Sequence, residues 1–78
     1  MEDIKKRIIS RLYRRNYIGG KHTNIDNLHK GLPGHLKGDA KRATNELIAE
    51  GILLTKPTSY GLEVSLNPRK IGEIEQYV

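Results

Sequence analysis

The segment 36–50 concentrates side chains that can hydrogen-bond to phosphates and to the edges of nucleic-acid bases. Its apolar positions recur at i, i+4, i+7 and i+11, which predicts an amphipathic helix; they are Leu36, Ala40, Ala43 and Leu47. The opposite side of that helix carries Gly38, Lys41, Arg42 and Asn45, with Lys37 and Thr44 toward one flank. An arginine can form a bidentate contact with guanine and an asparagine with adenine, and lysines suit phosphate or guanine.

The charges on this predicted helix are segregated. Lys37 and Lys41 are one turn apart, and neither has an acidic residue three or four positions away. Arg42 differs, because Asp39 and Glu46 are both within one turn of it and could neutralise it. The alternative interpretation is an ordinary solvated helix face.

Gly38 is a residue of low helix propensity within this predicted helix. A glycine inside a helix costs about 1 kcal/mol relative to alanine. The close approach of a DNA backbone at Gly38 would explain its presence.

A second basic stripe lies in the segment 3–15. Arg7, Arg11 and Arg14 fall one turn apart along one edge of a predicted helix, and Lys5, Lys6 and Arg15 surround them. This stripe is interpreted as a surface that contacts phosphates or steers a polyanion toward the protein. A solvated helix face explains the same pattern.

Composition limits the possible functions. The chain has 78 residues, which predicts one domain and argues against an enzyme with a large substrate cleft. Its net charge of +5 is unevenly distributed, since residues 5–42 hold eleven basic and two acidic residues. Such a surface attracts polyanions, so nucleic acid is the first partner to consider.

Other chemistry finds little support. The chain has no cysteine, and its three histidines (His22, His29 and His35) belong to different predicted elements, so neither a metal nor another cofactor is expected. Neither a nucleophile elbow nor a phosphate-binding loop occurs, so no enzymatic activity is expected. No apolar run approaches the roughly 18 residues of a membrane span, and we expect a cytoplasmic protein.

The elements that position these residues can be placed by their caps and breaks. Periodicity predicts helices at 3–15, 25–31 and 36–50, with Thr23 or Asn24 as the cap of the second and Gly31 at its end. Residues 17–18 suit only a bridging strand. Gly51 is predicted to stop the third helix.

A hairpin and a short helix are predicted to complete the chain. Strands at 52–56 and 62–66 are joined by a five-residue loop, 57–61, and the alternation of the second strand places Glu63 and Ser65 outward. Asn67 and Pro68 then read as the cap and first residue of a helix at 68–77.

This order of elements resembles the winged helix-turn-helix family of DNA-binding domains. The resemblance is carried by Ala43, Leu47 and Gly51 on the third helix, by Ile52-Leu53, and by residues 61–66. It implies an α+β, mainly α domain in which a three-helix core carries a β-hairpin wing and a short C-terminal helix. It also implies that the third helix enters the DNA major groove while the wing touches the adjacent backbone or minor groove.

Wings in this family often carry an arginine, and this chain departs from that pattern. The candidate wing contacts are Lys56, Ser59 and Tyr60. Lys56 is the only cation near the loop, and hydroxyl groups can donate to phosphate oxygens. The alternative is a neutral turn on which Tyr60 packs against its own hairpin.

Together these observations predict a small transcriptional regulator that binds duplex DNA in a prokaryotic or archaeal cytoplasm, as a nucleoid-associated protein. Two alternatives remain open. One is a winged-helix module that binds an acidic protein partner, and the other is an RNA-binding protein that uses the basic first helix. A homodimer is also conceivable, with an interface supplied by apolar residues that could equally belong to the core; these are Ile48, Leu53, Tyr77 and Val78.

Overall fold

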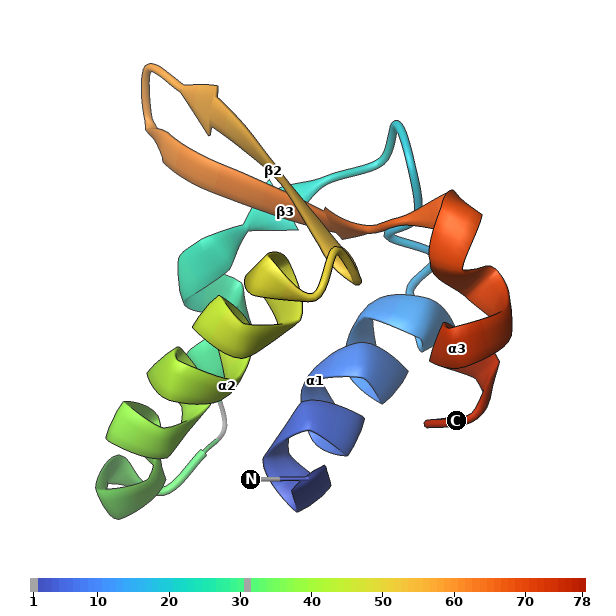
Figure 1. Ribbon diagram of the computed structural model, residues 1–78. Coiled ribbons are helices and arrows are strands. Elements are labelled where there is room, and N and C mark those ends of the chain that lie inside the picture. Colours follow the sequence, from blue (N-terminus) through green and yellow to red (C-terminus); the bar gives the residue numbers. More distant parts are fainter. Residues whose placement is uncertain (1, 31) are drawn as a thin grey trace.

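The computed structural model describes residues 2–30 and 32–78. Over these residues the chain forms a small α+β domain, mainly helical, with three α-helices and one three-stranded antiparallel sheet (Figure 1). The α-helices are α1 (Glu2–Arg14), α2 (Lys37–Ala49) and α3 (Ile71–Glu75). The strands are β1 (Thr23–Asn24), β2 (Leu53–Thr58) and β3 (Gly61–Leu66). Short 3-10 helices lie between them: η1 (Ile25–His29), η2 (Gly34–Leu36) and η3 (Pro68–Lys70).

Helices α1 and α2 pack side by side and supply much of the core (Figure 1). Ile9 of α1 is completely buried, as are Ala40, Ala43 and Leu47 of α2. The two alanines let neighbouring backbone come close to α2, because they carry almost no side chain. The apolar periodicity therefore predicted both helices to within a residue or two of their observed ends.

Both helices end in the way their sequences favour. Asn16 adopts a left-handed conformation (φ 62°) after α1, and the Tyr17 amide donates to the Leu12 carbonyl at 3.0 Å. Gly51 does the same after α2 (φ 78°), as predicted, and the Ile52 amide donates to the Leu47 carbonyl at 3.0 Å. These bonds satisfy carbonyl groups that a helix end leaves free.

The second predicted helix, 25–31, is wrong in type and length. Thr23 and Asn24 instead pair with β3, and only the five residues of η1 turn, as a 3-10 helix. The predicted cap is confirmed, since the Asn24 side chain accepts a hydrogen bond from the Asp26 amide at 2.8 Å. Strand pairing holds the chain extended up to Asn24, and Lys30 is again extended, so too few residues remain for an α-helix. The predicted end at Gly31 lies outside the described residues.

The sheet has the order β1-β3-β2, so that β3 is central and β2 lies at an edge. Strands β2 and β3 pair from Leu53 opposite Leu66 to Thr58 opposite Gly61. Ser59 and Tyr60 alone form the turn, which corrects the predicted five-residue loop. The Thr58 hydroxyl closes the turn by donating to the Gly61 carbonyl at 2.8 Å, and Gly61 supplies a φ of 130°.

Toward its end β3 becomes buried on both faces. Ser65 is fully buried rather than exposed, which corrects the prediction from alternation, whereas Glu63 is partly exposed. The Tyr17 carbonyl accepts from the Leu66 amide at 2.9 Å, and the Gly19 amide donates to the Leu66 carbonyl at 3.0 Å. The expected bridging strand at 17–18 is thus a single bridge from Ile18 to Leu66, and it draws this segment against the end of β3.

The C-terminal segment closes the domain beside α1 (Figure 1). The Asn67 side chain accepts from the Arg69 amide at 3.0 Å and donates to the Gly51 carbonyl at 2.8 Å, which confirms the cap. The predicted helix at 68–77 is divided into η3 and the shorter α3, whose Ile74 is fully buried. Among the described residues, no helix is long and apolar enough to cross a membrane.

Candidate nucleic-acid interface

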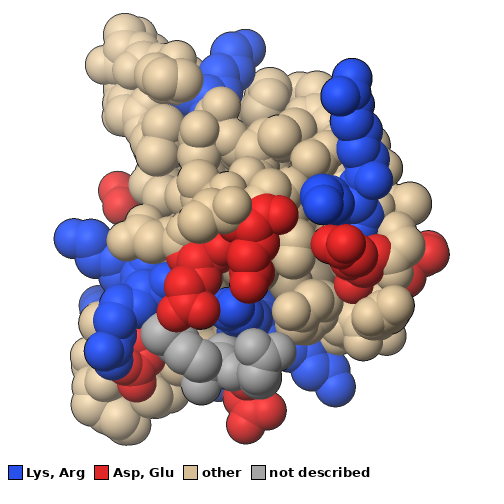
Figure 2. Space-filling view, in the orientation of Figure 1, with Lys and Arg blue, Asp and Glu red and all other residues tan. Residues whose placement is uncertain are grey.

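The outer side of α2 presents most of the predicted contact residues to solvent. Burial of the alanine and leucine stripe fixes the rotation of the helix, and the residues opposite that stripe are exposed: Lys37, Gly38, Lys41, Arg42 and Asn45. Figure 2 shows basic side chains along the outer edge of α2. A Cβ atom added at Gly38 would meet nothing within 4 Å, so this part of the helix surface is open.

The charges beside this face are arranged more favourably than the sequence indicated. Arg42 forms an ion pair with Asp39, although its side chain is still 70% exposed. Lys37 and Lys41 form no ion pair with any residue that the structure describes. Two of the three basic residues on this face, Lys37 and Lys41, can therefore contact a ligand without first breaking an ion pair with a described residue.

The two other acidic residues of the α2 segment turn toward α1 instead. The Lys5 ammonium is 3.1 Å from a Glu46 carboxylate oxygen and 3.3 Å from one of Glu50. Its hydrogen bond to Glu46 raises the pKa of Lys5 above the ordinary value, against the opposing effect of burial. Lys5 is only 4% exposed, so it does not belong to the basic surface on which the sequence had placed it.

Thr44 cannot contact a ligand, which corrects the sequence prediction. Its side chain is 1% exposed, and its hydroxyl donates to the Ala40 carbonyl at 2.8 Å. The buried stripe of α2 is therefore wider than its apolar residues alone indicate.

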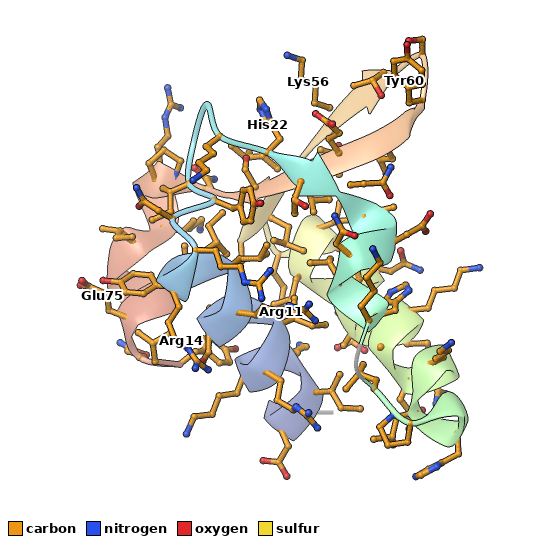
Figure 3. All side chains as sticks on the ribbon, turned by 180° about the vertical axis from the view of Figure 1, so that it is seen from behind. Arg11, Arg14, His22, Lys56, Tyr60 and Glu75 are labelled. Carbon is orange, nitrogen blue, oxygen red and sulfur yellow. The ribbon has the colours of Figure 1, made fainter. Side chains whose placement is uncertain are left out.

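The candidate wing residues lie at the far end of the hairpin. Figure 3 shows Lys56 and Tyr60 well away from the body of the domain. Tyr60 is 93% exposed, which excludes the alternative in which it packs on its own hairpin. Lys56 and Ser59 are exposed as well. Lys56 is paired in register with Glu63, so one acidic residue lies directly across the strand from it.

The structure groups the α1 arginines with a residue that sequence reasoning missed. Arg7 and Arg14 are exposed, and Arg11 donates to the Lys30 carbonyl at 2.6 Å. Together with Arg15 and Lys30 they line a cavity of about 300 Å³ between α1 and η1. Lys30 lies in a connection between elements, where periodicity gives no information about direction.

Other candidate sites find no support in the geometry. In the part of the chain that the structure describes, no cluster of three metal-ligating side chains occurs. The apolar residues considered for a dimer interface are largely used in the core, since Leu53 is 2% exposed and Ile48 and Tyr77 pack against the buried cluster; Val78 is half exposed.

Comparison of the sequence and structure with protein-family models, curated proteins and solved structures found no match.

Proposed function

We propose that this chain is a winged-helix protein that binds duplex DNA, with α2 in the major groove and the β2–β3 hairpin as its wing. The observation that carries the proposal is the exposed face of α2, defined by Lys37, Lys41, Arg42 and Asn45. The order and packing of α1, η1, α2 and the hairpin support it. The 3-10 helix η1 takes the place of the second helix of the motif.

The dimensions of α2 suit this role. Its 13 residues extend over about 20 Å, and a helix with side chains is about 10–12 Å across, close to the width of the major groove. Arg42 and Asn45 are proposed to contact base edges, and Lys37 and Lys41 to contact phosphates or guanine. Releasing Arg42 from Asp39 costs little, because exposed ion pairs contribute about 0–1 kcal/mol.

The wing is proposed to add weaker contacts. Lys56, Ser59 and Tyr60 can approach the backbone next to α2, and together they supply one cation and two hydroxyl groups. A small regulator of transcription in a prokaryotic or archaeal cytoplasm fits this arrangement.

The test is duplex-DNA titration of Lys41→Ala/Arg42→Ala at several salt concentrations. We expect affinity to fall several-fold and the slope of log K against log salt to decrease by about 1, because the variant loses the proposed phosphate contact of Lys41 together with the base contact of Arg42. The matched control is Lys6→Ala/Arg69→Ala, which removes two exposed charges outside the α2 face. Equal affinity and slope in the two double variants would show that α2 is not the DNA-binding element.

A further inference from the structure

The cavity between α1 and η1 belongs to an elongated basic groove, which we call the α1–η1 groove. A second cavity of about 160 Å³ adjoins the first and shares four lining residues with it: Arg11, Arg15, Leu28 and Lys30. The floor is apolar, since Ile8 and Leu28 are each 3% exposed. Five cations surround this floor: Arg7, Arg11, Arg14, Arg15 and Lys30.

The cations of the groove have no direct acidic partner within the described chain. No acidic residue lines either cavity, and none of the five cations forms an ion pair with a residue that the structure describes. Arg11 is held in place by its bond to the Lys30 carbonyl, so it does not need to be ordered when a ligand binds. Like charges this close repel one another, and a bound polyanion would relieve that repulsion.

The length of the groove favours a chain of anions over a single one. Arg7 and Arg14 are separated by seven residues of α1, or about 10 Å along the helix axis. One strand of a nucleic-acid duplex carries a phosphate about every 3.4 Å of its axis, so this distance corresponds to about three phosphates. Arginine is well suited to the contact, because its planar guanidinium can bind a phosphate through two donors.

The groove and the outer face of α2 are separate surfaces. The arginines lie on the side of the domain seen in Figure 3, where Arg11 and Arg14 are labelled on α1. The 3-10 helix η1 lies between them and α2, with the exposed Asp26 on it. We propose that the α1–η1 groove is a second phosphodiester-binding site, so that one molecule holds two nucleic-acid backbone segments at once. The simultaneous binding of two segments rests on the proposed function of α2, which would hold the other segment.

The test is capture of one nucleic acid by another through the protein. Duplex DNA is immobilised on beads, loaded with protein and washed, and a labelled second duplex is added. We expect wild-type protein to capture the labelled duplex. We expect Arg7→Gln/Arg14→Gln to capture about tenfold less of it, or less still, because two phosphate contacts are lost. The matched control is Lys6→Gln/Arg69→Gln, which removes two exposed charges outside the groove and should leave capture unchanged. Equal thermal unfolding of the variants shows that they are folded.

The outcomes for the two surfaces are distinguishable. If Arg7→Gln/Arg14→Gln captures the second duplex as well as Lys6→Gln/Arg69→Gln does, the groove inference is wrong. It is also wrong if wild type retains the first duplex but captures no second one. If Lys41→Gln/Arg42→Gln binds the first duplex as wild type does while the groove variant loses binding, the groove site is supported and the role of α2 is wrong.

Two further arms identify the ligand chemistry. Labelled RNA replaces the second duplex, and preferential capture of either would support a phosphodiester site and show which nucleic acid it favours. Inorganic phosphate is then added in place of chloride at constant ionic strength. We expect it to release little of the second segment. Complete release by phosphate at equal ionic strength would instead assign the groove to small anions and overturn the proposal.

Discussion

Lys5 shows how a single side chain changes the meaning of a charge pattern. By its position in the first helix it counts as one more surface cation, but it is buried against α2 and paired with Glu46 and Glu50. The pairing removes one positive charge from the exterior and offsets part of the negative charge on the acidic flank of α2. The basic face of α2 therefore has fewer unpaired acidic groups beside it than the sequence implied.

Lys5→Met tests the contribution of this pair to stability. Methionine keeps most of the aliphatic volume, and the two carboxylates are about half exposed, so we expect a loss of about 1 kcal/mol near neutral pH. Because folding raises the pKa of Lys5 above 10.5, the contribution is complete below that pH and disappears as the pH rises through the folded-state value. Denaturant unfolding of both proteins from about pH 7 to about pH 12 should thus show converging stabilities only above about pH 10.5. A gap that is unchanged across this alkaline range would contradict the assigned role of Lys5.

The contact residues themselves were only partly predictable. The exposed positions of α2 followed from its apolar stripe, whereas the burial of Thr44 depends on the tertiary packing around α2, which periodicity cannot reveal. Lys30 was missed for a related reason. Its place beside the α1 arginines is set by the path of a connection and not by any repeat.

At the scale of elements, strong periodicity and local caps determined what could be predicted. Helices α1 and α2 and the Asn24 and Asn67 caps were correctly placed, and the hairpin was correct except for the length of its turn. The segment 23–30 was not correctly predicted. Its apolar residues suit a helical turn, but its first two residues pair with β3 as a strand. Long-range strand pairing outweighs a weak local helix signal there.

Gly38 provides a test of α2 as an element. A methyl group added at Gly38 would meet no neighbouring atom, and alanine favours a helix more than glycine does. Gly38→Ala should therefore increase the free energy of unfolding by up to about 1 kcal/mol. If DNA backbone approaches this position closely, the same methyl group should weaken DNA binding. Thermal unfolding and DNA titration of one variant measure both effects. Unchanged or increased affinity would show that the glycine is not required for a close approach.

At the scale of the whole molecule, one buried cluster joins residues from α1, η1, α2, the sheet and α3. The short C-terminal helix is part of it through Ile74, and the Tyr13 hydroxyl adds a hydrogen bond of 3.2 Å to Glu75. Because each element buries its apolar face against the others, the described chain is expected to unfold cooperatively.

Ile74→Ala should therefore destabilise the entire domain and not only α3. Replacing a fully buried isoleucine by alanine typically costs about 2–5 kcal/mol, a large part of the stability of a domain this small. Urea unfolding followed by helix circular dichroism and by tyrosine fluorescence should give one coincident, shifted transition. Ile71→Ala, at a position that is 36% exposed, is the matched control and should shift it much less. Two separated transitions would mean that α3 unfolds independently.

The edge position of β2 also bears on how the protein behaves at high concentration. An open strand edge offers free backbone groups on which another chain can add a strand, and this is a common route to aggregation. Pro57 lies within β2 and has no N–H to offer, and the adjacent Lys56 places a charge there. The hairpin can thus extend into solvent as a separate arm while resisting the growth of an intermolecular sheet.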